Sequence, residues 1–369
     1  MMRGFSWQAI LALALAIVGA FFEAGNAHGA ADVWPALGLV ALAAIAARLA
    51  AAKPYAEALV LFVGAHLAAW LLLAGITGHE GDAGVSFYLA IAAAWLLAWR
   101  CATVLSAIKP SGRGESVALA LIIPVIFGAW ILILWEAIVR GAGIPFLLLP
   151  PPSAIAVRIA ASASILAADV RQTVFKAVAA GYVIGCGAGF VAAIAADRFV
   201  FLRRGLLPIG NMAAALPIIG VAPIMVMWFG FDWQSKAAVV VVMTFFPMLV
   251  NTVVGLTASG HMERDLMRTY ASGYWQTLAK LRLPAAMPFI FNALKINSTL
   301  ALIGAIVAEF FGTPVVGMGF RISTEVGRMN IDMVWAEIAV AAVAGSVFYG
   351  AVALIERAVT FWHPSIRGG

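Results

Sequence analysis

The chain has 369 residues, of which 64% are hydrophobic and only 11% are charged. A soluble globular domain has about 45–50% apolar and about 25% charged residues. The composition therefore excludes a cytosolic enzyme, a disordered chain, collagen and a coiled coil, and it makes the bilayer the main solvent. Two cysteines are too few for a disulfide framework. The net charge of +6 is informative only through the positions of the lysines and arginines.

Apolar segments long enough to cross a bilayer recur along the whole chain, since a spanning helix needs about 20 predominantly apolar residues. The first segment also fits a cleavable signal peptide, because its short apolar part follows Arg3. The sequence thus predicts an all-α polytopic membrane protein with about ten transmembrane helices. They are expected at 6–22, 34–52, 57–76, 86–108, 117–140, 170–196, 206–229, 236–257, 286–309 and 335–358.

The distribution of lysine and arginine predicts the orientation of these segments. With the amino terminus inside and ten alternating segments, the inside loops hold fifteen of these residues and the outside loops hold seven. Positive residues concentrate in cytoplasmic loops. Both termini of this multi-pass chain are therefore expected in the cytoplasm.

A polar linker at 109–114, which contains glycine and proline, marks a predicted domain boundary. Residues 1–108 are rich in alanine, have short loops and carry few polar residues. We expect them to form an accessory four-helix membrane unit. Residues 115–369 carry nearly all the unusual polar residues and are expected to form the working core of six helices.

The longest hydrophilic stretch between the expected spans of this core is amphipathic and covers residues 259–284. Its apolar residues, among them Leu266 and Tyr270, recur at three- and four-residue spacing. The pattern breaks at Ser272-Gly273, where glycine can stop a helix. Two interpretations are open: a helix that lies on anionic lipid, or a short helix that docks into a groove of a partner.

Residues 265–284 resemble the coupling motif of ATP-binding-cassette (ABC) importer permeases, in which Glu-Ala-Ala, three residues, Gly, nine residues, Ile, one residue and Leu-Pro follow each other. Counted back from Leu283-Pro284, Leu281 stands at the isoleucine and Ala271 at the glycine. Ala271 is the most serious departure, and we expect Gly273 to take over the turn. The resemblance implies that contact with the ATPase is made by Asp265, Leu266, Met267, Arg268, Tyr270, Ala271, Ser272 and Gly273.

Further stretches resemble the nitrate, sulfonate, taurine and pyrimidine branch of these type I permeases, and together they cover about 145–330 in the same order. They are 149–153, 173–189, 216–230, 246–255 and 308–320. The resemblance implies a homodimeric pore in the bacterial cytoplasmic (inner) membrane, in contact with lipid. It also implies two cytoplasmic ATP-binding subunits and an extracytoplasmic solute-binding protein as partners; nucleic acid is not expected.

The expected cargo is a small organic solute. The stretches 228–230 and 308–312 resemble permeases for thiamine-precursor pyrimidines more than nitrate permeases. Sulfonate, taurine and nitrate remain alternatives.

Polar residues and prolines within the expected spans are candidates for the translocation pathway or its gate, because polar groups are costly in a bilayer. For Asn251 and Asn297 the alternative is hydrogen bonding between helices. Pro217 interrupts a span and is expected to bend it. Glu309 ends a span and is expected to act at the gate with Arg321 or Arg328 as its partner; the alternative is a carboxylate that simply faces water.

Three glycines spaced by four, Gly181, Gly185 and Gly189, lie on one face of a predicted helix, a pattern that lets two helix backbones approach closely. Packing within the chain is favoured over a dimer contact.

The sequence offers no catalytic or metal-binding constellation. Its five histidines lack metal-ligand spacing, and no glycine-rich phosphate loop is present. We therefore expect no cofactor in this chain and a separate subunit that binds ATP. An intramembrane protease would need a serine–histidine pair or paired aspartates at membrane depth, and no serine has a histidine at an evident matching depth. The alternative that stays open is an ion- or proton-coupled secondary transporter, although such proteins usually carry several intramembrane carboxylates.

Overall fold

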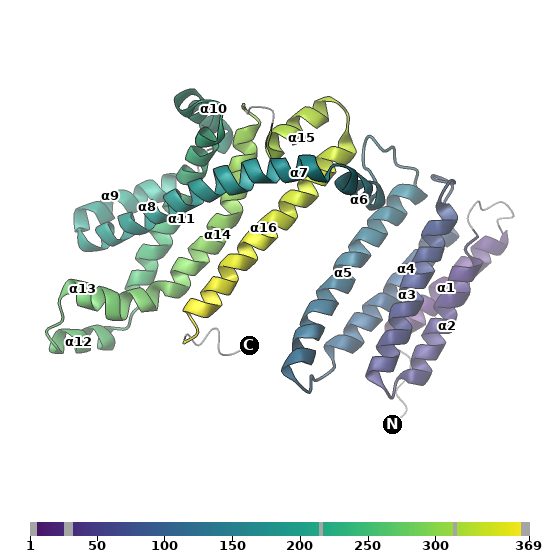
Figure 1. Cartoon of the computed structure of the whole chain (residues 1–369). Helices are drawn as coiled ribbons and strands as arrows, with labels where there is room; N and C mark the ends of the chain where they lie inside the picture. The colour runs from purple at the N-terminus through teal and green to yellow at the C-terminus, as the bar shows by residue number, and fades with distance from the viewer. Residues whose placement is uncertain (1–5, 26–31, 214–216, 313–315, 363–369) are drawn as a thin grey trace. The chain divides into compact units, whose positions relative to one another are not determined.

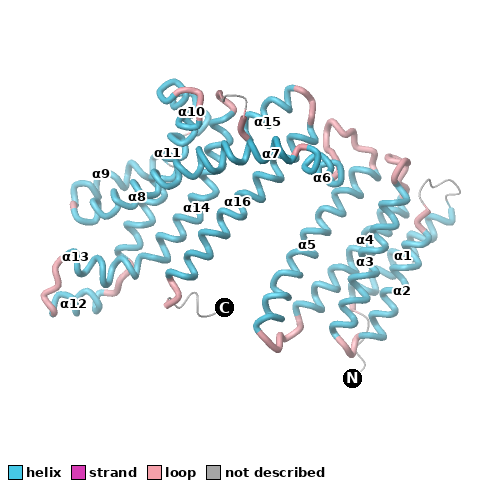
Figure 2. The backbone as a smooth tube through the Cα atoms, viewed as in Figure 1, coloured by secondary structure: helices cyan, strands magenta, loops and turns pink. Residues whose placement is uncertain are grey.

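The computed structural model describes residues 6–25, 32–213, 217–312 and 316–362, which form helices and no strand (Figures 1 and 2). Within these residues, eight helices are long and apolar enough to cross a membrane. They are Trp7–Ala24, Pro54–Ile76, Val85–Ser106, Arg113–Gly141, Ala163–Arg198, Trp233–Thr257, Tyr274–Glu309 and Ile331–Val359. The all-α polytopic fold expected from the sequence is confirmed.

Two of the ten expected segments differ from this set. Helix α2, Trp34–Ala50, has 17 residues and is shorter than the other spans. The segment expected at 206–229 forms two helices, α9 (Val200–Ala213) and α10 (Ile218–Phe229). Pro217 precedes α10 with an extended backbone, at φ −72° and ψ 113°, so it starts a helix and does not bend one. The prediction of one continuous span over 206–229, bent at Pro217, is therefore wrong. Residues 214–216, between the two helices, lie outside the described part.

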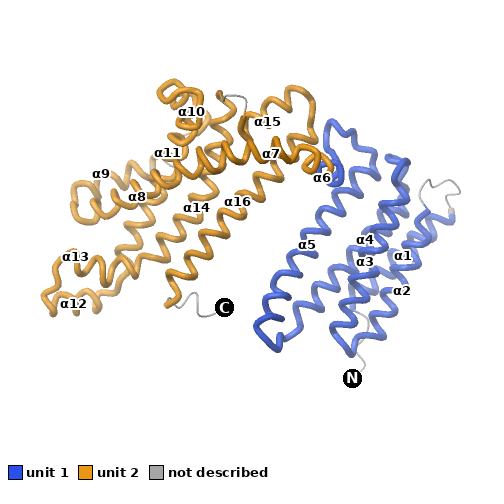
Figure 3. The backbone as a smooth tube through the Cα atoms, viewed as in Figure 1, with its two compact units in different colours: residues 1–156 blue, residues 157–369 orange. Residues whose placement is uncertain are grey.

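The chain divides into two compact units, residues 1–156 and 157–369 (Figure 3). Unit 1 holds α1 to α5: Trp7–Gly25, Trp34–Ala50, Pro54–Ile76, Val85–Ser106 and Arg113–Gly141. Alanine dominates its core, so that the helices pack closely. Helix α5 joins this core through Ile126 and Trp130, although it follows the linker at 109–114. That boundary between accessory unit and core stays a prediction.

Unit 2 is built around α8, α11 and α14, with α16 packed on α14. Helices α7, η1 and α8 follow one another without a loop, and so do α13, η2 and α14. The elements from α6 onward that have not yet been given bounds are α6 (Pro152–Ala161), α7 (Ala163–Val170), η1 (Arg171–Val178), α8 (Ala179–Arg198), α11 (Trp233–Thr257), α12 (His261–Thr269), α13 (Tyr274–Thr277), η2 (Leu278–Arg282), α14 (Leu283–Glu309), α15 (Met318–Gly327) and α16 (Ile331–Val359).

The face of α8 that carries Gly181, Gly185 and Gly189 packs against α11. A Cβ atom at Gly185 would lie 2.1 Å from Thr244 Oγ1, and one at Gly189 would lie 2.4 Å from the carbonyl oxygen of Phe245. Only glycine fits at these positions, so the glycine row brings two helices of the same chain together. The expected packing within the chain is confirmed.

We predict that Gly185→Ala lowers the stability of the chain by about 1–3 kcal/mol, because the new methyl group overpacks the contact with Thr244. The check is thermal unfolding of the detergent-solubilised chain, followed by circular dichroism. Gly187→Ala is the matched control: nothing lies within 4 Å of its Cβ position, and alanine in a helix is favoured by about 1 kcal/mol over glycine. Equal melting temperatures for both variants would contradict the close approach.

Candidate functional site

The hydrophilic stretch 259–284 contains two short helices, α12 and α13. They lie at one end of unit 2, the end at which α16 also finishes (Figure 1). Helix α12 is capped by Glu263, whose Oε2 accepts the Gly260 N–H at 2.9 Å. Arg264 holds α12 to the end of α11: its Nη2 donates to the carbonyl oxygens of Thr257 and Ser259 at 2.5 and 2.6 Å. The helix pair is therefore fixed to the bundle at its first turn.

One face of α12 is apolar and has no partner within the described residues. Met262, Leu266 and Tyr270 follow at intervals of four, and 86, 56 and 75% of their surfaces are exposed. Asp265 and Arg268 form an exposed ion pair at 3.4 Å between side chains of successive turns. An exposed apolar row on an anchored helix is suited to a partner's groove.

The turn between α12 and α13 lies at Ala271, whose φ of +50° is in the left-handed region. The Ser272 N–H donates to the Met267 carbonyl and the Ala271 N–H to the Arg268 carbonyl, at 3.0 and 2.9 Å. These two bonds define a Schellman helix end, in which glycine usually takes the left-handed position. Gly273 has an extended backbone, at φ −70° and ψ 169°, and precedes α13. The expectation that Gly273 takes over the turn is wrong.

Helix α13 and the start of α14 are tied to α8 through Asp197. Arg282 donates to both carboxylate oxygens of Asp197 at 2.6 and 2.8 Å, and the Tyr274 hydroxyl donates to Oδ2 at 2.9 Å. Arg282 Nε also donates to the carbonyl oxygen of Leu256, at the end of α11. Neither Asp197 nor Arg282 stands out in the sequence, since 85 residues separate them.

Helix α14 begins at Leu283 without a break from η2, so that α13, η2 and α14 form one continuous helical span from Tyr274 to Glu309. Pro284 has no N–H for the carbonyl four residues earlier. The turn before it is the π-helix η2, where the Leu283 N–H reaches the Leu278 carbonyl. From there α14 runs about 40 Å to Glu309, at 1.5 Å per residue. One helix thus joins the α12–α13 end of unit 2 to its opposite end.

At that opposite end Glu309 is buried, with 1% of its surface exposed. Its Oε1 accepts the Thr173 hydroxyl and its Oε2 accepts the Gly319 N–H, each at 2.7 Å. A Cβ atom at Gly317, where φ is +145°, would lie 2.8 Å from the Glu309 carboxyl group. The carboxylate therefore sits in a cradle formed by the Thr173 hydroxyl and the backbone of Gly317 and Gly319. The alternative interpretation, a carboxylate that simply faces water, is wrong.

The two arginines expected as partners of Glu309 contact other carboxylates. Arg321 Nε donates to Asp169 Oδ2 at 2.9 Å, and Arg328 lies 3.3 Å from Glu325. The hydrogen bond to Asp169 raises the pKa of Arg321, so its guanidinium stays charged. Asp169 also accepts the Gly317 N–H at 2.7 Å and thereby holds the start of α15 against α7. Both partner assignments for Glu309 are corrected.

The remaining pathway candidates lie in different surroundings. Asn297 is fully buried, and its Nδ2 donates to the Thr244 carbonyl at 2.8 Å and to Cys186 Sγ at 3.2 Å. Asn251 donates to the carbonyl oxygen of Pro247 in its own helix. The Nδ2 groups of both side chains are thus hydrogen-bonded, whereas Oδ1 of Asn297 is buried without a hydrogen-bond partner in the described part of the chain. Their pathway roles stay predictions. In the described ranges no group of three or more His, Cys, Asp or Glu residues could hold a metal ion.

The described residues form eight candidate spans, and unit 2 has an anchored pair of short helices at one end and buried carboxylates at the other. These are features of a multi-span membrane permease. Residues 185–361 match the family model described as the inner membrane component of binding-protein-dependent transport systems. The chain belongs to this family, the permeases of type I ABC importers. Such permeases generally work with ATP-binding and substrate-binding partners.

Three relatives show how far the similarity extends. The riboflavin transport system permease protein of Chloroflexus aurantiacus is 30% identical over 240 residues, which cover 64% of this chain and 88% of the relative. The formylaminopyrimidine transport permease protein of Halalkalibacterium halodurans is 29% identical over 247 residues, with 65 and 95% covered. A putative aliphatic sulfonates transport permease protein of Bacillus subtilis is 29% identical over 199 residues, with 54 and 71% covered.

We predict that Ala271→Gly stabilises the α12–α13 turn by about 1 kcal/mol, because the left-handed conformation costs an alanine roughly 1–2 kcal/mol. Hydrogen–deuterium exchange at the Ser272 amide, which the turn protects, should slow about fivefold. Ala279→Gly, at an exposed position of η2, is the control and should speed local exchange, since glycine weakens a helix. Faster exchange in Ala271→Gly would contradict the observed turn.

We predict that Glu309→Gln destabilises unit 2 by about 1–3 kcal/mol. The amide NH₂ of glutamine would replace one carboxylate oxygen and would then face either the Gly319 N–H or the Thr173 hydroxyl, both of which donate to Glu309. The Thr173 hydroxyl already accepts the Met318 N–H at 2.9 Å. It could accept the amide NH₂ with its second lone pair, but its own O–H would then lose the carboxylate oxygen to which it donates. Thermal unfolding of the purified chain measures the loss. Glu80→Gln, on an exposed loop, should change stability by less than about 0.5 kcal/mol. An unchanged melting temperature in Glu309→Gln would show that the cradle is not selective for a carboxylate.

Proposed function

We propose that this chain is the membrane-spanning subunit of an ATP-driven importer that works as a homodimer. Two cytoplasmic ATP-binding subunits would dock on the α12–α13 pair, and an extracytoplasmic solute-binding protein would deliver the solute to the opposite end. ATP would be bound and hydrolysed by the partner subunits. The single observation that carries this proposal is the exposed apolar row Met262, Leu266 and Tyr270 on a helix that is anchored to the bundle.

The route of coupling follows from the anchors of that helix pair. A force on α12–α13 would reach α8 through Asp197 and α14 through Arg282. Helix α14 ends at Glu309, whose cradle includes the first residues of α15. Rocking of these helices is a recurrent means of alternating access. Glu309 would then act at the gate by holding α15 in one of the two states.

The proposed location is the bacterial cytoplasmic membrane, with both termini and the α12–α13 pair on the cytoplasmic side. The excess of lysine and arginine on that side supports the orientation. Residues 1–108 are proposed to be accessory. The matched family model begins at residue 185, and about a third of this chain lies outside its alignments with the riboflavin and formylaminopyrimidine permeases.

The proposed solute is a small organic molecule of the thiamine-precursor pyrimidine type. The permease that carries formylaminopyrimidine in its name supports this choice, because 95% of its length aligns with this chain. Relatives named for riboflavin and aliphatic sulfonates have similar identity to this chain. Sulfonate, taurine and nitrate are the other candidates, because permeases named for each of them are also similar to this chain. The ligand bound by the cognate solute-binding protein, identified by mass spectrometry of the purified protein, would decide among them.

We predict that Leu266→Asp and Tyr270→Asp each weaken binding of the ATP-binding subunit about tenfold or more, because a carboxylate on an exposed apolar row cannot be desolvated in a groove. Both side chains are exposed, so insertion of the chain should be unchanged. Co-purification of the ATP-binding subunit and ATP-dependent uptake in proteoliposomes are the measurements.

Met329→Asp is the matched control for this experiment. Met329 is an exposed methionine between α15 and α16, at the other end of unit 2. The same carboxylate there should leave the ATP-binding subunit in place. Full binding and transport in both Leu266→Asp and Tyr270→Asp would exclude docking on this helix.

A further inference from the structure

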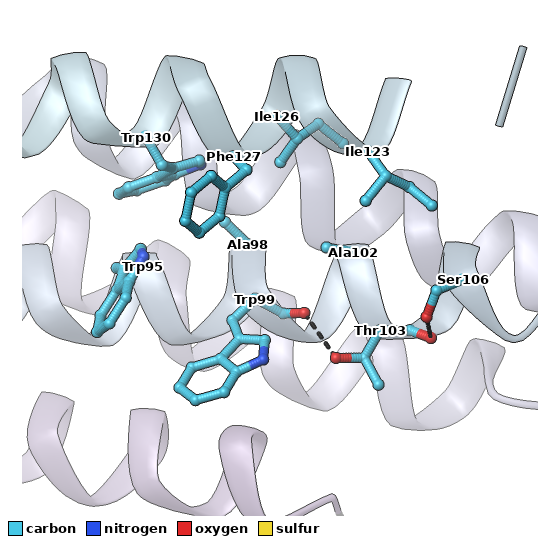
Figure 4. A pocket seen from close by; sticks show the side chains of 10 residues that line it. All are labelled: Trp95, Ala98, Trp99, Ala102, Thr103, Ser106, Ile123, Ile126, Phe127 and Trp130. Atoms are coloured by element: carbon cyan, nitrogen blue, oxygen red, sulfur yellow. Dashed lines mark hydrogen bonds between the residues drawn. The ribbon is translucent and has the colours of Figure 1, made fainter. Parts of the chain in front are cut away.

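Unit 1 contains an apolar groove between α4 and α5 with a volume of about 400 Å³ (Figure 4). Trp95 and Trp99 on α4 and Phe127 and Trp130 on α5 line most of it. Trp99 and Phe127 are 45 and 64% exposed, so the groove opens toward the surroundings of the unit. None of these residues has a place in the proposed coupling route.

The groove offers little to a polar ligand. Its two hydroxyl groups, on Thr103 and Ser106, donate to the carbonyl oxygens of Trp99 and Thr103 in their own helix, each at 2.9 Å. Its lining on α4 runs from Trp95 to Ser106, which is about 16 Å of helix. An apolar groove of this length can accommodate an extended hydrocarbon chain.

Two positive charges lie beyond the Ser106 end of this groove. Lys109 and Arg113 stand in the connection to α5 and at its first residue, and both are exposed. In the described part of unit 1 neither of them takes part in an ion pair. The neighbouring carboxylate of Glu115 is engaged by the Tyr55 hydroxyl and by Ser111. Glu115 keeps its negative charge, so this end of the groove has two exposed cations against one carboxylate, a net charge of +1 that complements an anionic headgroup.

We propose that the groove binds one acyl chain of an anionic phospholipid, with the phosphate of the headgroup beside Lys109 and Arg113. A lysine or arginine near the membrane surface raises the affinity for anionic lipid about fivefold. A partner's helix would fill the apolar slot but would not account for the two charges at its end. The proposal gives unit 1 a function of its own, and it does not depend on the transported solute.

The test uses the tryptophan fluorescence of the chain, in which the groove supplies three of the twelve tryptophans, Trp95, Trp99 and Trp130; the part of the quenching that depends on the groove is identified with variants. The full chain is reconstituted in phosphatidylcholine vesicles that contain increasing mole fractions of a phospholipid brominated on its acyl chains, which quenches nearby tryptophan fluorescence. We expect brominated phosphatidylglycerol to reach half-maximal quenching at about a tenfold lower mole fraction than brominated phosphatidylcholine. The double variant Lys109→Gln, Arg113→Gln should lose this preference. Equal quenching by the two lipids in the unmodified chain would overturn the proposal.

Two further variants separate the groove from general charge effects. Arg203→Gln, Arg204→Gln removes two exposed charges from α9 in unit 2 and should keep the preference; its loss there would show that any two charges suffice and overturn the site. Ala102→Phe fills the groove from its α4 side and should abolish the preference. If Ala102→Phe leaves the preference intact but changes the oligomeric mass of the chain, the groove is a protein contact and the proposal fails.

Discussion

A charge removed from water within a bilayer is costly unless a nearby group compensates it. Three ion pairs between helices of unit 2 meet this constraint. Breaking a buried ion pair by removing one partner typically costs about 3–5 kcal/mol. The pairs thus join neighbouring helices: α8 with η2, α14 with α16, and α7 with α15. They are Asp197–Arg282 at 2.6 Å, Lys295–Glu356 at 2.7 Å and Asp169–Arg321 at 2.9 Å.

Helix α14 takes part in this neutralisation at several levels. Arg282, just before its first residue, is paired at the α12–α13 end, and Lys295 is paired with α16 in its middle. Its last residue, Glu309, is held by Thr173 and by the backbone at the start of α15. Helix α14 is thus fastened to its neighbours at both ends and in its middle. It is the element that joins the proposed docking surface to the proposed gate.

The sequence predicted the helices well and the side-chain contacts poorly, for physical reasons. Apolar segments of about 20 residues identify spans without any knowledge of their neighbours, whereas Pro217 acts through its local backbone and divides one expected span. The glycine row of α8 indicated a close helix contact correctly, because its spacing alone defines a face. The partners of Glu309 lie more than a hundred residues away, at Thr173, and in a backbone N–H, at Gly319. Neither contact can be predicted from the local sequence pattern around Glu309.

The turn between α12 and α13 shows the same limit at smaller scale. The break in the amphipathic pattern placed the turn correctly to within two residues, but the residue with the left-handed backbone is Ala271 and not Gly273. Alanine is disfavoured there, so propensity pointed to the nearby glycine. The hydrogen bonds that close the helix end at Met267 and Arg268 decide the position instead.

The cradle of Glu309 has a consequence for how mutational scans of this chain should be interpreted. One of its donors is the amide of Gly319, which every substitution except proline retains. A Cβ atom at Gly319 would lie 2.0 Å from the carbonyl oxygen of Ile306. An alanine scan through 317–319 would therefore report steric exclusion while the hydrogen bond itself escaped detection. Replacing the amide at 319 by an ester, through chemical ligation, is the substitution that removes the donor and leaves the shape.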